Sequence, residues 1–382
     1  MVVEVHAFLS SARARALGRL VLLAGVALSP VGRADEITFH AGWAVGAPQG
    51  GAGTILRSED SGNTWSRQGL GQVASVEFSG VSAASPVAAW VVGDASEGYA
   101  TIYHTSNGGV TWTRQGSAGV IPNTGLTKVH ALNTSNVWAV GTSAILHSTD
   151  GGQTWLNHVP AGYENTHLQG IFAVDATHVW VTGATNAAGY ATILKSSDAG
   201  ATWLLQTGGE VNRANHLLGI SAVDAQTAWT VGGTGSGYIA LRTTDGGATW
   251  SEQDGLIGSY DANEVSAVNA TTVWVACDRM LYRSTDGGAN WAGQGAGDYT
   301  VGLSAVSPLE AWATRALYNG SLYHTTDGGT NWTQITQLGG ENLPGMTAVS
   351  FALQAIPEPS TLALCLGCLG FAALWSRRRR HQ

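Results

Sequence analysis

The chain has 382 residues, of which 12% are charged, 52 are glycine and 15 are tryptophan. Low charge with abundant glycine and tryptophan is typical of short strands joined by tight turns, and it argues against a helical or disordered protein. Between Asp35 and Ile356 the sequence has 24 acidic and 10 basic residues, which gives a net charge of −14. An acidic body repels phosphate backbones, so we exclude nucleic acid as a partner.

The N-terminus predicts a signal peptide over residues 1–34. Three arginines between positions 13 and 19 precede a nine-residue apolar run (20–28) and a small-residue cleavage site before Asp35. This order of basic, apolar and small residues is typical of a secretory leader. Nine apolar residues are too few to cross a bilayer as a helix. We therefore expect export, with the mature chain beginning at Asp35.

A short motif of the form Ser/Thr-x-Asp-x-Gly-x-Thr/Asn-Trp recurs seven times between residues 58 and 332. We name these segments the aspartate turns. Their third position holds Asp60, Asn107, Asp150, Asp198, Asp245, Asp286 and Asp327, and their last position holds Trp65, Trp112, Trp155, Trp203, Trp250, Trp291 and Trp332. Successive copies are 41 to 48 residues apart, which is the length of a four-stranded propeller blade.

Two apolar segments precede most aspartate turns and predict strands. One contains a second tryptophan, as in AWVVG (89–93), and the other lies earlier, as in LLGISAV (217–223). The first repeat lacks the earlier segment, whereas the spare segment MTAVSFAL (346–353) follows the last repeat. An open ring would leave unpaired strand edges, which promote aggregation. We therefore predict an all-β, seven-bladed β-propeller of four-stranded antiparallel blades over residues 35–355, with strand 346–353 closing the first blade.

The aspartate turns are interpreted as structural fasteners. Glycine supplies the positive φ of a tight turn, the aspartate accepts hydrogen bonds from backbone N–H groups, and the tryptophan buries a large aromatic area. A calcium loop is the weaker alternative. One carboxylate per turn, replaced by Asn107 in the second copy, provides too few hard oxygen ligands.

The Ser-x-Asp-x-Gly-x-Thr-Trp motif resembles the Asp-box, or BNR repeat, and region 42–353 resembles Asp-box β-propellers. The combination of GWAVG (42–46) with ILRSEDSGNTW (55–65) is most similar to the photosystem II assembly-factor type. Asp-boxes also occur in sialidases and in some xyloglucan-cleaving glycosidases. The resemblance implies that the box is a peripheral structural turn, remote from any catalytic centre.

The sequence contains no motif of a catalytic, cofactor or metal site, so we expect a protein that is not an enzyme and that binds no cofactor or metal. The sialidase arginine motif and the H-E-x-x-H spacing are both absent. The one thiol of the body, Cys277, is interpreted as a small buried hydrophobe. A glycosidase needs two facing carboxylates, and the candidates are Asp94 with Glu97, or Asp254, Asp261 and Glu264. We expect these five acids in loops, as solvated side chains.

A basic or imidazole side chain lies three residues before the third position of every aspartate turn. We name these residues the cation series: Arg57, His104, His147, Lys195, Arg242, Arg283 and His324. Two interpretations stay open. In one, each side chain packs along the third strand over an aromatic face or towards a carboxylate. In the other, the series forms a ring that binds an acidic polysaccharide or partner.

The C-terminus, 356–382, carries Pro357, Glu358 and Pro359, then an apolar run from Leu362 to Trp375, then four arginines. This tripartite order closely resembles the PEP-CTERM sorting signal of Gram-negative bacteria. The resemblance implies transient membrane anchoring through 360–376, removal of the tail by an exosortase, and delivery to the cell surface or the exopolysaccharide matrix. A simple tail anchor is the alternative, and in either case the basic cluster is expected to stay cytoplasmic.

Three functions remain open at this point. The preferred one is an exported, surface- or matrix-delivered binding scaffold without catalysis, whose partners are the export machinery, the exosortase and an unidentified protein or polysaccharide. The second is a carbohydrate-active hydrolase or lyase that uses carboxylates at the mouth of the channel. The third is a protein like the photosystem II assembly factors.

Overall fold

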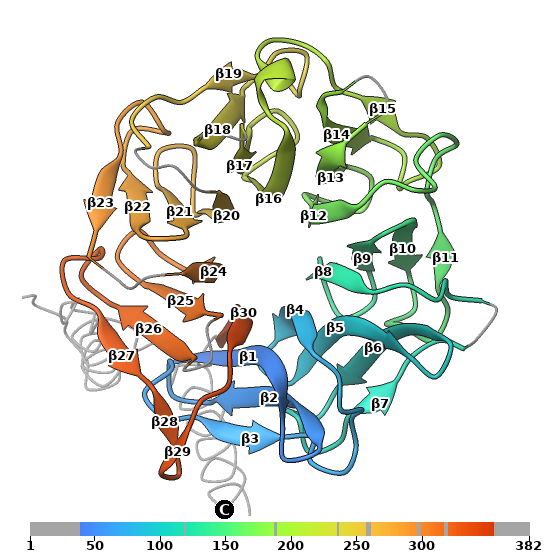
Figure 1. Ribbon diagram of the computed structural model, residues 1–382, viewed down its shortest axis with the longest axis vertical. Coiled ribbons are helices and arrows are strands. Elements are labelled where there is room, and N and C mark those ends of the chain that lie inside the picture. Colours follow the sequence, from blue (N-terminus) through green and yellow to red (C-terminus); the bar gives the residue numbers. More distant parts are fainter. Residues whose placement is uncertain are drawn as a thin grey trace, which may run out of the picture. The chain divides into compact units, whose positions relative to one another are not determined.

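Seven four-stranded antiparallel sheets surround a central channel in the computed structural model (Figure 1). The structure describes residues 39–117, 120–186, 189–234, 237–256, 261–295, 299–316 and 320–354. All of these residues belong to one compact unit, Phe39–Ala355. The expected signal peptide (1–34) and sorting segment (356–382) lie outside the described residues.

Six of the blades are built from four consecutive strands, ordered from the channel outwards. Blade 2 contains β4 (Phe78–Ser85), β5 (Ala88–Ser96), β6 (Tyr99–Thr105) and β7 (Thr113–Arg114), and blade 3 contains β8 (Leu126–Ala131), β9 (Val137–Gly141), β10 (Ala144–Ser148) and β11 (Leu156–Asn157). Blade 4 contains β12 (Leu168–Ala173), β13 (Val179–Thr185), β14 (Ala191–Ser196) and β15 (Leu204–Leu205), and blade 5 contains β16 (His216–Ala222), β17 (Ala228–Gly233), β18 (Tyr238–Thr243) and β19 (Ser251–Glu252). Blade 6 contains β20 (Ala262–Ala267), β21 (Val273–Cys277), β22 (Leu281–Ser284) and β23 (Ala292–Gln294), and blade 7 contains β24 (Thr300–Ala305), β25 (Ala311–Arg315), β26 (Ser321–Thr325) and β27 (Thr333–Ile335).

Blade 1 joins the two ends of the described chain. It contains β1 (Phe39–Gln49), β2 (Ala52–Ser58) and β3 (Ser66–Gln68), and its innermost strand is the C-terminal β30 (Met346–Gln354). β30 pairs with β1 in antiparallel register, with Phe39 opposite Gln354 and Trp43 opposite Ser350 (Figure 1). The predicted seven blades and the predicted closure by the C-terminal strand are both confirmed.

The hydrophobic core lies between neighbouring blades rather than inside any one sheet. A representative cluster combines Trp90 and Ile102 of blade 2 with Val129 and Trp155 of blade 3. The second strand of each blade is buried on both faces, which explains its continuous apolar sequence. Its tryptophan is at most 1% exposed in all seven blades: Trp43, Trp90, Trp138, Trp180, Trp229, Trp274 and Trp312. The tryptophans therefore pack with aliphatic side chains of the neighbouring blade to hold the blades together.

Small elements decorate the end of the ring opposite the aspartate turns. A two-stranded hairpin, β28 (Gln337–Leu338) with β29 (Glu341–Asn342), lies in the connection from blade 7 to β30, and a 3₁₀ turn, η1 (Val211–Arg213), lies between blades 4 and 5. Among the residues that the structure describes, no helix has both the length and the hydropathy needed to cross a membrane.

Candidate functional site in the central channel

The innermost strands line a cavity of about 320 Å³ in the channel. One residue of each strand, opposite the second-strand tryptophan of its own blade, lies on this lining. We name these seven residues the channel ring: Ser350, Ser82, His130, Phe172, Ser221, Ser266 and Ser304, in blade order from 1 to 7. The sequence analysis missed this ring, although its six members in blades 2 to 7 lie eight residues before the second-strand tryptophan.

The five serines of the channel ring also connect neighbouring blades. Each Oγ accepts a backbone N–H from the innermost strand of the next blade, over 3.0 to 3.3 Å: Ala83 to Ser350, Ala131 to Ser82, Ala267 to Ser221, Ala305 to Ser266 and Phe351 to Ser304. Because each oxygen acts as the acceptor, its own hydrogen stays available as a donor. Within the described part of the chain, none of these five hydroxyls donates a hydrogen bond to another residue. The channel wall therefore presents several hydroxyl donors.

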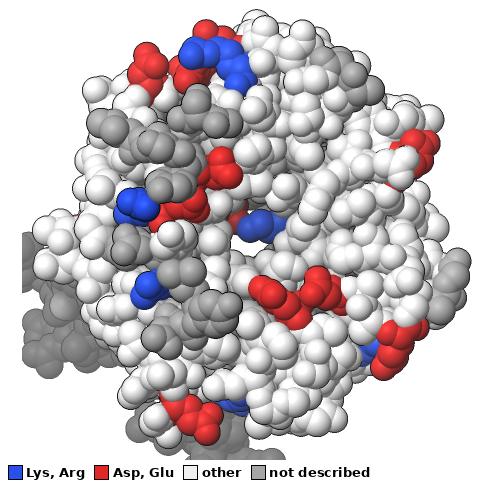
Figure 2. Space-filling model, viewed as in Figure 1, with Lys and Arg blue, Asp and Glu red and all other residues white. Residues whose placement is uncertain are grey.

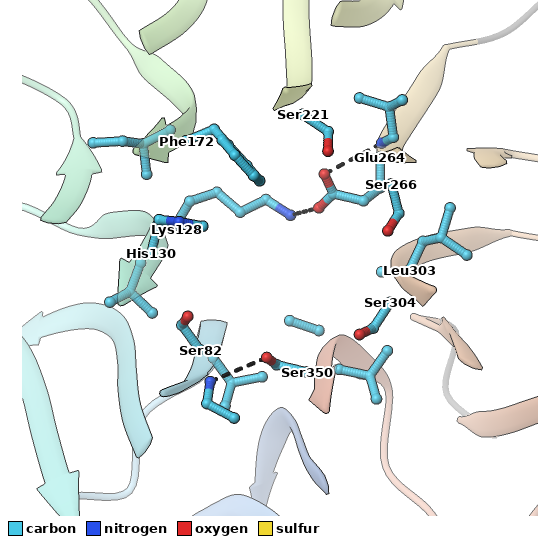
Figure 3. Close-up of a pocket in the computed structure, with 18 of the residues that line it drawn as sticks. Ser82, Lys128, His130, Phe172, Ser221, Glu264, Ser266, Leu303, Ser304 and Ser350 are labelled. Carbon is cyan, nitrogen blue, oxygen red and sulfur yellow. Dashed lines mark hydrogen bonds and ion pairs between the residues drawn. The ribbon is translucent and has the colours of Figure 1, made fainter. Parts of the chain in front are cut away.

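Two charged side chains meet across the channel above this ring. Lys128 on β8 and Glu264 on β20 form an ion pair between blades 3 and 6, which lie on opposite sides of the ring (Figure 3). Both are largely buried, with side-chain exposures of 22% and 15%. Figure 3 shows the lysine chain reaching over the cavity to the carboxylate. The expectation that Glu264 lies in a loop is wrong, because β20 begins at Ala262 and carries it into the channel wall.

The other blades carry almost no side chain at this level. On each innermost strand, the equivalent position lies two residues before the member of the channel ring. In blades 2 to 7 these residues are Gly80, Lys128, Gly170, Gly219, Glu264 and Gly302, ten residues before the second-strand tryptophan, and in blade 1 the residue is Ala348. Neighbouring strands approach these glycines closely, since a Cβ at Gly302 would lie 2.8 Å from the Cα of Ala348. Only two of these positions, in blades 3 and 6, hold a side chain longer than a methyl group.

An aromatic pair flanks the lysine end of the bridge. The rings of His130 and Phe172 have centroids 4.4 Å apart and are tilted by 39°. Burial lowers the pKa of His130 to about 4, although a hydrogen bond with the carbonyl of Ala173, at 3.1 Å, opposes that shift. His130 is therefore neutral at neutral pH. The charges of Lys128 and Glu264 cancel, so the described lining of the cavity carries no net charge.

Acidic side chains gather beside the central opening, and one basic side chain is visible within it (Figure 2). The expectation that Asp94 lies in a loop is wrong, because it belongs to strand β5 of blade 2, where its N–H donates to the carbonyl of Glu77 over 3.1 Å. Burial raises the pKa of the Glu77 carboxyl, and the charge of Asp94 adds to that rise. Glu97, in contrast, forms an ion pair with Arg114 at 2.8 Å. The carboxylate neighbour of Asp94 is therefore Glu77, which the sequence analysis did not single out.

The second group of candidate acids does not converge on one point. Asp254 is exposed, and Asp261 forms an ion pair with His216 at 3.1 Å. Glu264 forms its ion pair with Lys128. The structure therefore gives each of these three acids a different environment.

The aspartate turns share one hydrogen-bond pattern, which blade 5 illustrates. The side chain of Asp245 accepts the backbone N–H of Thr249 at 2.9 Å and the hydroxyls of Thr249 and Thr243 at 2.6 and 2.8 Å. The hydrogen bonds from Thr249 are the main reason that the pKa of Asp245 falls to about 2. Asn107 makes a similar set, except that its amide donates to the hydroxyl of Thr111 at 2.9 Å. The turn therefore needs one side-chain oxygen that accepts the backbone N–H, and a second side-chain atom that either accepts from or donates to the hydroxyl of the same threonine.

The cation series lies over the second-strand tryptophans. Three histidines stack on these tryptophans with ring centroids 3.7 to 4.5 Å apart, and four cations lie over the ring with Cζ or Nζ 4.5 to 5.5 Å from the ring centroid. The pairs are Arg57 on Trp43, His104 on Trp90, His147 on Trp138, Lys195 on Trp180, Arg242 on Trp229, Arg283 on Trp274 and His324 on Trp312. Several members also reach the next blade. The ammonium of Lys195, for example, donates to the carbonyl of Gly246 at 2.7 Å.

The aspartate turn of one blade therefore packs against the tryptophan of the blade before it. Trp250 meets Trp180 edge to face at 5.6 Å and 85°, and a Cβ at Gly247 would clash with the ring of Trp180. We name such a unit, made of a second-strand tryptophan, its stacked cation and the following aspartate turn, a blade joint. This geometry favours the packing interpretation of the cation series.

The remaining candidate, Cys277, is fully buried in the core between blades 5 and 6. Burial raises the pKa of its thiol. Within the described ranges, no three or more His, Cys, Asp or Glu side chains are grouped in a way that would hold a metal ion.

Comparisons with known proteins assign the tail and the class of fold. Residues 355–380 match the PEP-CTERM protein-sorting motif, which confirms the sorting signal expected around Pro357, Glu358 and Pro359. That motif implies export across the inner membrane and exosortase-dependent processing in Gram-negative bacteria. No curated protein matches the chain in sequence.

Solved structures similar to the chain include both enzymes and other proteins. YCF48 bound to D1 peptide is 18% identical, with a TM-score of 0.53 over 76% of this chain and 86% of that one. The GH74 enzyme of Niastella koreensis is 18% identical, with a TM-score of 0.50 over 79% of this chain and 57% of that one. A protein from Lactobacillus plantarum is 11% identical, with a TM-score of 0.59 over 83% and 100%. Identities this low show the propeller fold alone.

Proposed function

We propose that this chain is an exported, non-catalytic binding propeller, sorted by an exosortase to the cell surface or the exopolysaccharide matrix. The observation that carries the non-catalytic part of the proposal is the Lys128–Glu264 bridge, whereas the sorting part rests on the motif match at 355–380. Among the described residues that line the cavity, Glu264 is the one carboxylate, and its ion pair with Lys128 leaves it unsuited to act as a free acid or base. A polar cavity in a rigid ring is suited to recognition.

The topology supports a division of labour between the two ends of the ring. In every blade the aspartate turn connects the third and fourth strands, so all seven turns lie at one end. The connections between blades lie at the other end, around the mouth of the channel. We assign binding to the mouth and the channel, and assembly of the ring to the blade joints.

The sorting part of the proposal is tested in the producing cell. Replacing Pro357, Glu358 and Pro359 by alanine in the full chain is expected to shift the protein from the surface and matrix fractions to the membrane fraction. The matched control is Ser376→Ala, which leaves the tripartite order unchanged. An unaltered distribution of the triple variant would contradict exosortase-dependent delivery.

A second candidate function, cleavage of a glycan, is favoured by the Glu77–Asp94 pair. A carboxyl with a raised pKa beside a second carboxylate is the usual arrangement of an acid and a base in glycosidases. The exported protein is incubated with the host's own exopolysaccharide, and new reducing ends are measured. We expect none. Turnover that Glu77→Gln abolishes would establish the enzymatic alternative in place of the binding scaffold.

The class of partner is the remaining choice, and polysaccharide is preferred because the proposed destination is the exopolysaccharide matrix. YCF48, a structural neighbour, has been solved with a D1 peptide, so a protein ligand and a role like that of the photosystem II assembly factors are the alternatives. Saturable binding of the exported protein to purified exopolysaccharide is the expected result. Binding that disappears when the matrix is treated with protease, but not with glycosidase, would favour a protein partner.

A further inference from the structure

The Lys128–Glu264 bridge is not required by the architecture of the ring. The pair connects opposite blades, whereas adjacent blades are already connected by the serines of the channel ring and by the blade joints. Glycine or alanine fills the equivalent position in the five other blades. Removing two charges from bulk water is costly, so the pair is a poor way to gain stability.

The lining of the cavity combines four kinds of group. It offers the carboxylate of Glu264 as an acceptor, the ammonium of Lys128 and the serine hydroxyls as donors, and the ring of Phe172 as an apolar face (Figure 3). Opposite charges cancel and His130 is neutral, so the wall attracts neither an anion nor a cation in particular. The matching ligand has hydroxyl groups that both donate and accept, and one apolar face.

We infer that this cavity binds a single uncharged pyranose unit, as the end or a side branch of a polysaccharide. Each sugar hydroxyl both donates and accepts a hydrogen bond, and the C–H face of the ring packs on an aromatic side chain. This inference rests on the proposed binding function and names its ligand class.

The size of the cavity sets the length of the bound segment. A volume of about 320 Å³ lies at the lower end of the range for ligand pockets, which is about 300–1,000 Å³. It admits one sugar ring rather than an extended chain, so an end or a branch enters from the mouth. A sugar hydroxyl placed between Nζ of Lys128 and the carboxylate of Glu264 accepts from one and donates to the other. Both charges thereby keep a partner when their direct contact is broken.

The test uses the exported protein as purified from the producing cell and three sugars: glucose, galactose and N-acetylglucosamine. Binding is detected by saturation-transfer NMR and quantified by calorimetry. At least one sugar is expected to bind. Glu264→Gln and Lys128→Met should each weaken binding about tenfold or more, because each removes a charged hydrogen-bond partner. Phe172→Leu, which keeps an apolar side chain but removes the aromatic face, should weaken it about threefold or more.

Controls separate the cavity from the surface and folding from binding. Glu97→Gln and Arg114→Met disrupt an ion pair on the outer part of blade 2, where Arg114 belongs to the outermost strand β7, and should leave sugar affinity unchanged. Circular dichroism and thermal melting verify that each variant is folded, and Phe172→Leu provides a second arm if a charge variant does not fold. Sugar binding that Glu264→Gln and Phe172→Leu both leave intact would place the ligand elsewhere and overturn the inference.

Failure of this inference can be distinguished from failure of the proposed function. If no sugar binds but the protein still reaches the matrix and binds it, the channel inference is wrong and the scaffold proposal stands. If a sugar binds in the channel but the Pro357–Pro359 variant is delivered normally, the sorting proposal is wrong and the channel inference stands. Preferential binding of inorganic phosphate would overturn the assignment of an uncharged ligand.

Discussion

The blade joints and the channel lining obey the sevenfold repeat to different degrees. Every joint contains the same parts: a second-strand tryptophan, a basic or imidazole side chain over it, and an aspartate turn from the following blade. The channel lining keeps its pattern in some blades and departs from it in others, with Lys128, His130, Phe172 and Glu264 as the departures. A position that is identical in every repeat serves the architecture, whereas a position that differs in two blades is free to serve a ligand.

The largest expected effect comes from removing the aromatic part of one joint. Trp180→Ala deletes a fully buried side chain and should lower the free energy of unfolding by about 3–5 kcal/mol. The channel counterpart, Lys128→Met with Glu264→Gln, should cost less than about 2 kcal/mol, because the fold tolerates glycine at that level in four blades. Chemical denaturation compares the two. Equal losses would contradict the division between joint and channel.

A charge reversal in the cation series is expected to be the next largest. Lys195→Glu places a carboxylate over Trp180 and against the carbonyls of Ala225 and Gly246, and should cost roughly 2–3 kcal/mol. Lys195→Arg is the control, since arginine occupies this position in blades 1, 5 and 6. Loss of partner binding at unchanged stability would instead support the binding-ring interpretation.

The histidines predict a stability change on the acid side of neutrality. Burial lowers the pKa of both His130 and His147 to about 4, and nearby His158 contributes to the shift of His147. Between pH 6.5 and 4 the unfolded chain therefore binds protons that the folded chain does not, so stability is full above pH 6.5 and falls towards pH 4. Each histidine should contribute roughly 1–3 kcal/mol to that loss.

Substitutions taken from other blades sharpen this pH test. His147→Arg copies blades 1, 5 and 6, and His130→Ser copies the channel-ring serine of five blades. Melting temperatures from pH 7.5 to 4.5 should fall less steeply in each variant than in the parent protein. Parallel curves for parent and variants would show that neither histidine titrates in this range.

The smallest effect is expected inside the aspartate turn. Asp245→Asn should change the melting temperature by less than a few degrees, because Asn107 already builds the same turn in blade 2, whereas Asp245→Ala should lower it by more. The lowered pKa of Asp245, about 2, means that its contribution is present above about pH 4 and is lost as the pH falls towards 2. Asp245→Asn should remove that acid dependence. If the asparagine variant is as unstable as the alanine variant, the prediction that asparagine can build this turn is contradicted.

The fold could be predicted from the sequence because each blade repeats its own local pattern. The spacing of Asp150, Asp198 and the other turn positions fixes the blade length, and the unattached segment 346–353 indicates the closure. Each of these features depends on residues close together in the chain, and local patterns are the part of structure that a sequence displays directly.

The channel site could not be predicted in the same way. Lys128 and Glu264 are 136 residues apart and meet only because a seven-membered ring places blades 3 and 6 on opposite sides. From the sequence alone, Glu264 is expected to be a solvated loop acid, since a body with a net charge of −14 has carboxylates along its whole length. The one sequence feature that indicates this site is the position of the two charged residues within their repeats. Ten residues before the second-strand tryptophan, four blades have glycine and two have a long charged side chain.

The pairing of β30 with β1 has a consequence for how the molecule is made. Hydrogen bonds such as that from Thr347 to the carbonyl of Val45 join segments 302 residues apart, so blade 1 stays incomplete until the last strand has been synthesised. Contacts this distant in sequence form slowly, because a long loop must close first. An exported chain would therefore finish folding only after almost its whole length has left the cytoplasm, and Gln354, the last residue of that strand, directly precedes the sorting motif at 355–380. Cutting within the tail then leaves every strand of the toroid in place.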